Sequence, residues 1–408
     1  MQRWLKFVKY LPSFGYQPIV YTPENPFIEI QDQSLLKDIS PEAEVIKLPI
    51  WEPYGIFQKL LGKGKLKQAD FVTAKKKSLT QKFALFIRGN FFIPDARVFW
   101  VRPSVAFLTD FIKSNSINTI ITTGPPHSMH LIGLKLKSKN PSLKWIADFR
   151  DPWSEWGLLD SLKASTWARS IHRRLERRVL HKADEVITIT PFYVNQFERL
   201  SGRKVNLLTN GFDEADFKNF SKRKADKFYL RHIGAVNDRC DPRTFMLACA
   251  QLCNEEQEIK DNMVIEFIGE VHSTFKEFVE KNISVAEITK FAPSVSHKKL
   301  IDVYETSAIL VLILVGYKDA EGYMPGKLFE YLATGLPVLG IGPSNGDAAL
   351  VLSESKTGVM FVEDDNEGIR KFIKDKYLDW INSNHNSMKK NISKFSRREI
   401  TGELVKLL

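Results

Sequence analysis

Short apolar runs alternate with amphipathic stretches along almost the whole chain, and this alternation constrains the fold more than any other feature of the sequence. In the first half, the runs Thr119–Thr123 and Lys144–Asp148 are each followed by a stretch with helical periodicity. The second half repeats the pattern, for example after Tyr229–Gly234 and Met263–Gly269. Because strands that alternate with helices pair in parallel, we expect an α/β protein with doubly wound parallel sheets.

The chain is long enough for two domains. Its 408 residues exceed what one ordinary hydrophobic core organises. The turn-forming sequence NGFD marks a boundary near Thr209–Phe217. We therefore expect a Rossmann-like domain at 1–210, a second at 211–385, and a terminal segment at 386–408 whose helix packs back on the first. The two domains are expected to face each other across a cleft, with the carboxyl ends of their strands toward it.

Composition and cysteine content indicate a folded protein of a reducing compartment. Hydrophobic residues make up 43% and charged residues 26% of the chain. The cysteines Cys240, Cys249 and Cys253 are odd in number and lack metal-ligand spacing. The longest apolar run, near Ala308–Val315, is far shorter than the roughly 20 residues of a membrane span. The amino end lacks the apolar core of a signal peptide, so the sequence predicts a cytoplasmic protein.

Basic and aromatic side chains are concentrated in residues 51–103, which hold eleven Lys/Arg against three Asp/Glu. Large apolar residues such as Trp51, Phe83 and Phe91 interleave with these charges. This mixture suits an anionic membrane surface, but also single-stranded nucleic acid or an ordinary solvated face. We predict peripheral attachment to an anionic membrane, at the inner face of the plasma membrane, and no nucleic-acid partner.

Residues 323–340 read YMPGKLFEYLATGLPVLG and predict a short helix followed by a strand. Pro325 suits the first turn of the helix, and Gly335 suits its end. Lys327 and Glu330 are three residues apart and share a face near the amino end. Free backbone N–H groups and Lys327 favour an anion such as phosphate, while Glu330 can accept hydrogen bonds from sugar hydroxyls. The alternative is a solvated Lys–Glu pair on a surface helix.

Further candidates in the second half lie at strand ends or helix starts, where open α/β sheets bind ligands. Gly234 ends a strand and lets a ligand approach the backbone closely. Arg239 follows five residues later with a guanidinium suited to phosphate, although a single arginine is more often a surface ion-pair partner. The remaining candidates for this ligand site are Gly269, Pro293, Val295, Gly326 and Leu328.

Two strand ends in the first half carry polar residues. His127 follows a Gly-Pro-Pro turn after the strand at 119–123, and Asp148, Arg150 and Asp151 follow the next strand. These residues could be structural, as a buried histidine, a helix cap and an Asp–Arg pair. The functional interpretation places Asp151 or Asp148 near a reacting centre, with His127 facing the cleft.

Taken together, these motifs resemble a family 4 retaining glycosyltransferase of the two-domain GT-B type, in the branch that makes bacterial surface polysaccharides. The stretches that carry the resemblance are QRWLKFVKYLPSFGYQPIVYT, ITTGPPHS, WIADFRDPW, ADEVITIT, TNGFDEADF, YLRHIGAVNDR and PGKLFEYLATGLPVLGIGP. They span nearly the whole chain. The last stretch and DFRDPW are the most specific, whereas the others are typical of many GT-B proteins.

The resemblance implies that the second domain binds a nucleotide-diphosphate-sugar donor and the first a lipid-linked or oligosaccharide acceptor. Arg239 and Lys327 would hold the diphosphate and stabilise charge on the leaving nucleotide, so that neither a metal ion nor a prosthetic group is required. Glu330 would bind the ribose hydroxyls. The activity implied is that of a hexosyltransferase of cell-envelope polysaccharide biosynthesis, with same-face attack that retains the anomeric configuration.

The sequence departs from the family pattern at two places. A second acid is common eight residues before the ribose-binding one, but that position is Gly322, and Glu321 lies one residue away. A strand and a Gly-rich loop should precede QRWLKF, so we expect that the sequence begins late. Two other functions remain open: a nucleotide-sugar 2-epimerase of similar architecture, and a non-catalytic relative that binds a partner.

Overall fold

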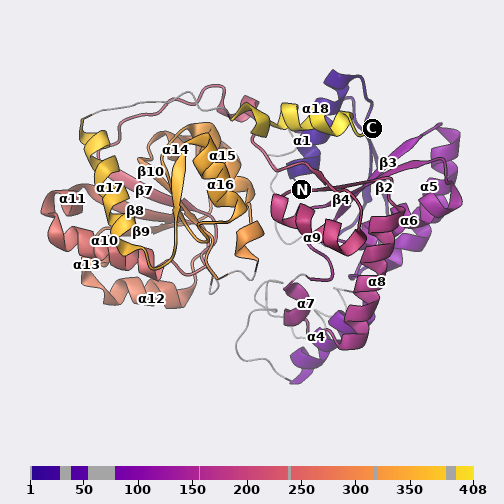
Figure 1. Cartoon of the computed structure of the whole chain (residues 1–408), viewed down its shortest axis with the longest axis horizontal. Helices are drawn as coiled ribbons and strands as arrows, with labels where there is room; N and C mark the ends of the chain where they lie inside the picture. Colours follow the sequence, from indigo (N-terminus) through magenta and orange to yellow (C-terminus); the bar gives the residue numbers. More distant parts are fainter. Residues whose placement is uncertain are drawn as a thin grey trace. The chain divides into compact units, whose positions relative to one another are not determined.

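The fold is described from a computed structural model, which defines residues 2–27, 38–53, 79–155, 157–237, 240–316, 319–382 and 392–408 (Figure 1). The chain divides into two compact units. The carboxyl-terminal unit comprises Asn210–Ile400 with Met1–Phe7, and the amino-terminal unit comprises most residues up to Thr209 with Thr401–Leu408. Each unit is described by itself below.

The carboxyl-terminal unit contains a six-stranded parallel sheet of order β12-β11-β10-β7-β8-β9. The order of strands along the chain reverses between β7 and β10, and such a reversal is where doubly wound sheets bind ligands. The sequence pattern of residues 286–291 favours a strand, but β9 begins only at Thr289, because residues Ile283–Ala286 form a turn of helix. The strands are β7 Phe228–Ile233, β8 Met263–Ile268, β9 Thr289–Ala292, β10 Ile309–Ile313, β11 Val338–Ile341 and β12 Gly358–Phe361.

Both faces of this sheet are buried by helices, as the unbroken apolar runs predict. Along β10, Ile309 and Val311 pack into one hydrophobic cluster with α10 and α17, whereas Leu310 and Leu312 pack into another with α15 and α16. Successive side chains of a strand point to opposite faces, so an all-apolar strand needs cover on both. The helices are α10 Arg243–Glu255, α11 Gln257–Asn262, α12 Ser273–Lys281, α13 Ile283–Ala286, α14 His297–Glu305, α15 Gly326–Thr334, α16 Asp347–Ser355 and α17 Asn366–Ile381.

The amino-terminal unit holds two parallel sheets. One pairs β1 Ile19–Pro23 with β2 Glu44–Leu48. The other has the order β3-β4-β5-β6. The sequence pattern of residues 205–209 favours a strand, but the last strand, β6, is only two residues long. The strands of this second sheet are β3 Thr119–Gly124, β4 Lys144–Phe149, β5 Glu185–Thr188 and β6 Asn206–Leu207.

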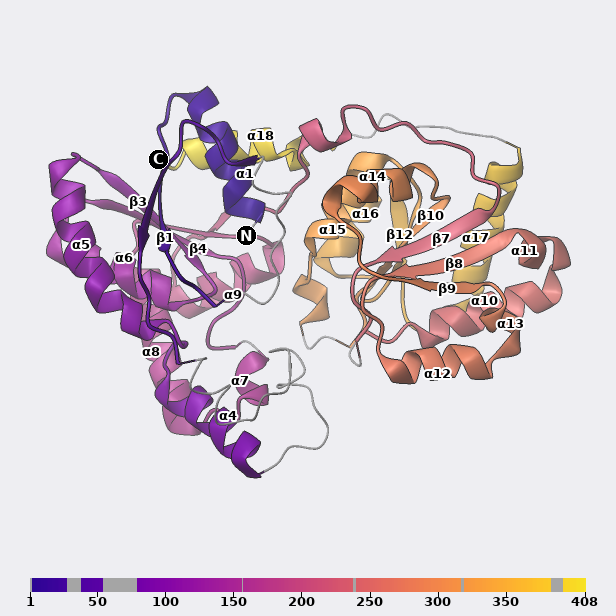
Figure 2. The same cartoon turned by 180° about the vertical axis from the view of Figure 1, so that it is seen from behind.

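Two helices of the amino-terminal unit, α8 and α9, begin at residues whose side chains cap them. Ser165 accepts a hydrogen bond from the Ala168 N–H at the start of α8, and Thr190 does the same for Tyr193 at the start of α9. Helices α5 and α6 pack side by side (Figure 2). The helices are α4 Leu79–Phe91, α5 Val101–Ser114, α6 Ser128–Lys139, α7 Leu158–Ser161, α8 Thr166–Lys182 and α9 Pro191–Ser201. Two further helices, α1 Gln2–Tyr10 and α18 Arg397–Val405, lie near the chain ends.

Part of the basic and aromatic segment can be placed. The sequence pattern near 70–88 favours a helix, and α4 begins within that range at Leu79 and ends beyond it at Phe91, while residues 54–78 are outside the described ranges. In the described part of the chain, every helix is too short or too polar to cross a bilayer.

Candidate functional site

The first candidate site lies where the carboxyl-terminal sheet reverses its strand order. Strands β7 and β10 are neighbours there, and the chain leaves their carboxyl ends in opposite directions. Helix α15 begins at Gly326, with Pro325 as its N-cap in an extended conformation, so its first N–H groups have no acceptor within the helix. An anion at that end of the helix would meet these N–H groups and the positive end of the helix dipole.

Lys327 reaches from the start of α15 to the end of β7. Its Nζ donates a hydrogen bond to the Ile233 carbonyl oxygen at 3.1 Å and lies 3.4 Å from Nε2 of His232. Burial lowers the pKa of Lys327 to about 8, and burial followed by the charge of Lys327 holds the pKa of His232 well below its usual value. The structure thus places an incompletely stabilised ammonium at the switch point, where a phosphate would supply the missing negative charge.

Two glycines shape the backbone beside this lysine. Gly234 and Gly269 have φ angles of 125° and 145°, in the region that favours glycine. A Cβ on Gly269 would lie 2.4 Å from the Gly234 carbonyl oxygen, and one on Gly234 would lie 3.3 Å from Nζ of Lys327. Side chains at these positions would displace the ends of β7 and β8 and crowd the lysine.

Glu330 lies one turn beyond Lys327, within a buried polar group of the same unit. Its Oε2 accepts a hydrogen bond from the Tyr304 hydroxyl at 2.8 Å. Burial lowers the pKa of Arg397 to about 9; Arg3 adds to this shift, and Asp213 and then Glu330 oppose it. The Tyr304 hydroxyl therefore fixes one oxygen of the Glu330 carboxylate, and the charge of Glu330 acts on the Arg397 guanidinium.

The other residues predicted for this site have different surroundings. Pro293 is exposed and Val295 half-buried, and both follow β9, at the same edge of the sheet as Gly269. The side chain of Leu328 is fully buried in the core, and its N–H donates to the Pro325 carbonyl oxygen. Contact of Leu328 with a ligand would thus require its backbone to shift.

Arg239 lies outside the described residues, so its predicted partnership with Lys327 is untested. Its neighbour Cys240 is buried, and its thiol donates to the Ile313 carbonyl oxygen at 3.4 Å. Burial raises the pKa of Cys240 to about 11, and the charge of Lys327 opposes this shift. The chain therefore passes close to Lys327 immediately after position 239.

A second group of candidates lies at the carboxyl ends of β3 and β4. His127 follows the Gly124–Pro126 turn and is buried, with its ring stacked on Trp153 at 4.9 Å and 4°. Burial, and then the neighbouring His130, hold the pKa of His127 well below its usual value, so this imidazole is neutral at neutral pH. A neutral imidazole can accept a proton or a hydroxyl hydrogen bond, which is what an acceptor-binding group needs.

The two predicted aspartates come together beside this turn. Asp148 is fully buried, and its Oδ2 accepts a hydrogen bond from the Thr123 hydroxyl at 2.8 Å. Burial raises the pKa of Asp151, the Arg150 guanidinium lowers it, and Asp148 raises it further. Arg150 also donates to the carbonyl oxygens of Gly124 and Pro125, so it ties the loop after β4 to the turn after β3.

Two side chains of helix α8 accept hydrogen bonds from the loop after β4. Nδ1 of His172 accepts a hydrogen bond from the Trp153 indole at 2.9 Å. One turn later, the carboxylate of Glu176 accepts from the N–H groups of Trp153 and Ser154, each at 3.3 Å. Burial raises the pKa of Glu176 to about 7, while the backbone donors favour its charged form.

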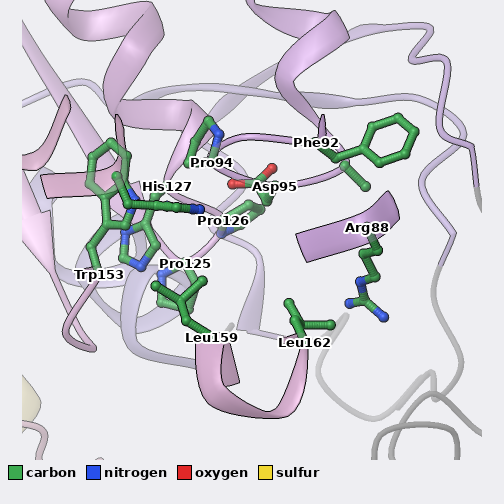
Figure 3. A pocket seen from close by; sticks show the side chains of 12 residues that line it. Arg88, Phe92, Pro94, Asp95, Pro125, Pro126, His127, Trp153, Leu159 and Leu162 are labelled. Carbon is green, nitrogen blue, oxygen red and sulfur yellow. The ribbon is translucent and has the colours of Figure 1, made fainter. Parts of the chain in front are cut away.

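A pocket opens beside these groups, with His127 and Trp153 on one side and Arg88 and Phe92 on the other (Figure 3). Its walls are mainly apolar. The carboxylate of Asp95 is turned away from solvent, since it accepts hydrogen bonds from the Ser128 N–H and hydroxyl at 2.8 and 2.7 Å. The remaining lining residues are Pro94, Ala96, Pro125, Pro126, Leu159, Leu162 and His172.

Reasoning from sequence missed several residues at both sites. His232 had a signal, because a histidine inside the buried run YLRHIG needs a polar reason to be there. The sequence signal for Glu176 was weaker: it is the only acid in a helix rich in arginine. Tyr304 and Arg397 had none, because they reach Glu330 only through the tertiary fold.

Comparison with solved structures identifies the architecture. Sucrose-phosphate synthase from Thermosynechococcus elongatus matches 98% of this chain and 90% of its own, with a TM-score of 0.61 at 14% identity. HepE of Anabaena, solved with UDP-glucose, matches 99% of this chain and 94% of its own, with a TM-score of 0.56 at 11% identity. The fold is GT-B. The expected fold class, an α/β protein with doubly wound parallel sheets of the GT-B type, is thereby confirmed.

The same architecture also occurs in a different kind of enzyme. A Listeria monocytogenes protein named as a UDP-N-acetylglucosamine 2-epimerase matches 99% of this GT-B chain and 91% of its own, with a TM-score of 0.53 at 12% identity. Scans of the sequence against protein-family models and curated proteins gave no match. At these identities the likeness establishes the fold, and the chemistry must be argued from the site.

Proposed function

We propose that this GT-B protein transfers a sugar from a nucleotide-diphosphate-sugar donor to a lipid-linked or oligosaccharide acceptor. The reaction is that of a family 4 hexosyltransferase, with retention of the anomeric configuration, in the synthesis of a cell-envelope polysaccharide at the inner face of the plasma membrane. The donor binds the carboxyl-terminal unit at the switch point, and the acceptor binds the amino-terminal unit at the ends of β3 and β4.

The observation that carries this proposal is the position of Lys327. Its ammonium lies at the start of α15 beside the end of β7, and burial leaves its pKa at about 8. A donor diphosphate would draw Nζ away from the Ile233 carbonyl oxygen and restore its full charge. When the glycosidic bond breaks, negative charge grows on the leaving diphosphate, so a preorganised cation there stabilises the transition state more than the ground state.

Other parts of the unit suit the rest of a donor. Arg239 would add a second cation to the diphosphate, and Gly234, Gly269 and Gly326 leave room for its approach. Glu330 is held by Tyr304 in one orientation, which supports a role in binding ribose hydroxyls. The loop at 293–295 would contact the base through its backbone.

The acceptor groups are neutral or shielded, which suits a sugar hydroxyl. His127 is uncharged at neutral pH, and Arg150 keeps Asp151 next to the turn after β3. We assign Asp151, Asp148 and His127 to orienting the acceptor hydroxyl or the transferred sugar. No metal ion or prosthetic group takes part in this proposal.

A panel of nucleotide sugars in a thermal-shift screen tests the proposal. A donor at 100 times its Kd stabilises the folded protein by about 2.7 kcal/mol, so the correct base and sugar raise Tm measurably. The Lys327→Met variant should show no rise with the same compound. If no nucleotide sugar stabilises the wild-type protein, the proposal is wrong. Binding without turnover on any acceptor would instead support a non-catalytic relative.

The second candidate is a nucleotide-sugar 2-epimerase, which the match to the Listeria monocytogenes protein favours. Incubation of the bound donor without acceptor separates the two. A transferase leaves the donor sugar unchanged apart from slow hydrolysis, whereas an epimerase converts it to the 2-epimer. NMR of the recovered donor distinguishes these outcomes.

A further inference from the structure

One face of helix α8 carries an uninterrupted row of arginines. Arg173, Arg174, Arg177 and Arg178 are all exposed, and Lys182 extends the row at the end of the helix. The only acidic residue of the helix, Glu176, is buried on the opposite face. Across the described residues, none of the four arginines forms an ion pair.

This arrangement destabilises the isolated helix. Arg173 lies four residues before Arg177, and Arg174 four before Arg178, so like charges are neighbours on the helix surface. An ordinary solvated helix relieves such repulsion with interspersed acids, as α17 of the other unit does with Lys376 and Asp379. The arginine row of α8 is therefore a concentrated positive surface that an anionic partner would stabilise.

Helix α4, which contacts α8, presents large apolar side chains to solvent. Leu79, Phe83 and Phe86 are spaced by four and three residues, so they share one face, with exposed fractions of 83%, 65% and 43%. Phe91, at the end of the helix, is 67% exposed. Apolar side chains that gather in this way usually mark a binding surface.

The carboxyl end of α4 is hydrogen-bonded to the segment that leads into α8. Oδ1 of Asn90 accepts a hydrogen bond from the Ser165 N–H at 2.8 Å, and its Nδ2 donates to the Lys163 carbonyl oxygen at 3.3 Å. Both views show α4 beside the amino end of α8 (Figures 1 and 2). Trp167, in the first turn of α8, is 60% exposed, and its position along the helix is between the start of α8, where α4 is attached, and the arginine row.

We propose that the apolar face of α4, Trp167 and the arginine row of α8 form one docking surface for an anionic lipid bilayer. The phenylalanines and Leu79 enter the boundary between headgroups and acyl chains, the indole lies at the headgroup level, and the arginines bind lipid phosphates. An exposed leucine adds nothing to a nucleic-acid site, where aromatic rings stack on bases, so the combination favours a membrane. The inference gives a location to the membrane attachment in the proposed function and rests on it for its biological purpose.

Flotation of the full chain with phosphatidylcholine vesicles, with and without phosphatidylglycerol, tests the surface. We expect binding only to the anionic vesicles and a decrease as NaCl is raised. Replacing the row by Arg173→Gln, Arg174→Gln, Arg177→Gln and Arg178→Gln should weaken partition at least about a hundredfold, since each bound cation contributes about fivefold. Leu79→Ser with Phe83→Ser should weaken it about tenfold.

A matched variant removes the same charge elsewhere. The exposed residues Lys281, Lys290, Lys299 and Lys371 of the carboxyl-terminal unit, all changed to Gln, should leave partition within a few-fold of wild type. Equal loss in both quadruple variants, equal binding to neutral vesicles, or tighter binding to a single-stranded oligonucleotide would overturn the proposal. Circular dichroism checks that α8 stays folded. Nucleotide-sugar binding is measured on the same variants, so that a failure of the proposed transferase function is recognised separately.

Discussion

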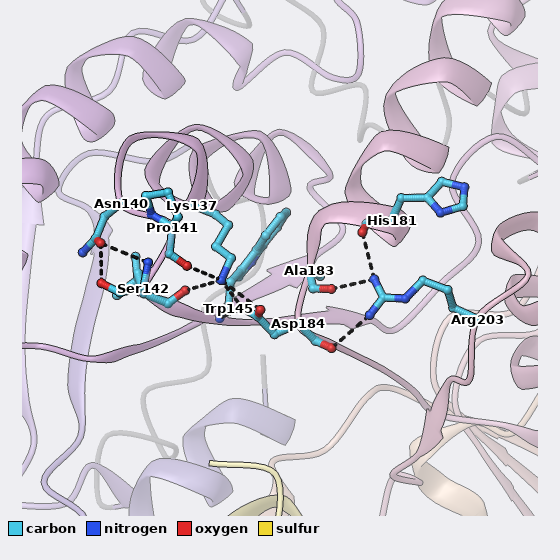
Figure 4. A network of polar contacts seen from close by, with 10 residues as sticks. Lys137, Asn140, Pro141, Ser142, Trp145, His181, Ala183, Asp184 and Arg203 are labelled. Carbon is cyan, nitrogen blue, oxygen red and sulfur yellow. Dashed lines mark hydrogen bonds and ion pairs between the residues drawn. The ribbon is translucent and has the colours of Figure 1, made fainter.

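The two ends of the amino-terminal sheet are built for different purposes. At the amino ends of its strands, Nζ of Lys137 donates to the Pro141 and Leu143 carbonyl oxygens, both at 2.9 Å, and to Asp184 at 2.8 Å (Figure 4). Arg203 donates to three carbonyl oxygens at the end of α8. At the carboxyl ends, by contrast, burial shifts the pKa values of His127, Asp151 and Glu176.

The carboxyl-terminal sheet repeats the contrast. Near the amino end of β10, the Arg231 guanidinium is paired with Glu266 at 2.6 Å and donates to the Ser307 hydroxyl at 3.2 Å. At the carboxyl end of β7, the hydrogen-bond partners of the Lys327 ammonium among the described residues are a carbonyl oxygen and a histidine nitrogen, and burial lowers its pKa to about 8. Lys137 and Arg231 thus have carboxylate partners within the protein, whereas the ammonium of Lys327 has none among the described residues.

The comparison teaches which cations to assign to stability and which to function. A group whose partners are complete contributes to folding, and its loss leaves buried acceptors unsatisfied. A group held away from its ordinary pKa by burial carries stored free energy that binding can release. The predictions below test this distinction with pairs of substitutions, beginning with the largest effect.

The sharpest test replaces two lysines by methionine, one at each kind of strand end. Lys327→Met should lower the transfer rate about a thousandfold, because the removed charge acts on the leaving diphosphate, and should leave stability unchanged or slightly increased. Lys137→Met should leave the rate near wild type and destabilise the fold by about 2 kcal/mol, since three acceptors lose their donor. Initial rates and urea unfolding measure both. If Lys137→Met lowered the rate and Lys327→Met destabilised the fold, the distinction between the two kinds of strand end would be wrong.

The next prediction concerns Glu176, whose pKa is about 7 in the folded protein against 4.5 ordinarily. A raised folded-state pKa adds stability that is complete below pH 4.5 and is lost as pH rises through 7. Wild type should therefore lose about 3 kcal/mol of stability relative to Glu176→Gln between pH 4.5 and pH 8. Urea midpoints of both proteins across this range measure the difference.

The transfer rate should also depend on the ionisation of Glu176, but it should increase with pH, whereas stability decreases. The ionised carboxylate is the better acceptor for the Trp153 and Ser154 N–H groups, so the wild-type rate should fall as pH drops below 7. Glu176→Gln should have no such acid limb. A variant profile parallel to wild type would mean that Glu176 does not position the loop that carries Asp151.

Two glycine-to-alanine substitutions, one at the switch point and one far from it in sequence, test the backbone conformation there. Gly269→Ala forces a methyl group to 2.4 Å from the Gly234 carbonyl oxygen at a φ of 145°, so it should destabilise the protein by roughly 2–3 kcal/mol and weaken donor binding. Gly15→Ala also has positive φ, at 84°, but open space around it, and should cost about 1 kcal/mol with donor affinity intact. Thermal unfolding and donor calorimetry compare the two variants.

The smallest expected effect is a pH dependence of donor affinity. With the pKa of Lys327 at about 8 in the free protein, the cation is lost above that pH, and donor Kd should then rise about tenfold per pH unit. Below pH 8 the affinity should be nearly constant. Lys327→Arg keeps its charge and should abolish the dependence, as calorimetry between pH 7 and pH 9.5 would reveal. Parallel curves for the two proteins would contradict the assignment.

Much of the fold was predictable because it depends on local pattern. The runs at 144–148 and 338–341 became β4 and β11, and the helix predicted after Pro325 is α15. Errors occurred where the pattern was short or ambiguous. The run at 205–209 pairs over only two residues, and residues near 286 close a helical turn before β9 begins.

The candidate sites were predictable only where the residues lie in one motif. Lys327 and Glu330 share a helix turn, and Asp148 and Asp151 share a loop, so a single stretch of sequence places each pair. Whether Arg239 joins Lys327 stays a prediction. The contacts of Glu176 with Trp153 and Ser154 join segments more than twenty residues apart, and no periodicity encodes which side chains meet across such a distance.

The sequence by itself determined the succession of strands and helices, the apolar faces that bury them, and the glycine, lysine and acid chemistry of its motifs, because these follow from spacing and residue type. The tertiary structure decided the strand order and therefore the switch point beside Lys327. It also decided the burial that shifts the pKa values of Lys327, His127 and Glu176, since the cost of charging a group depends on everything packed around it.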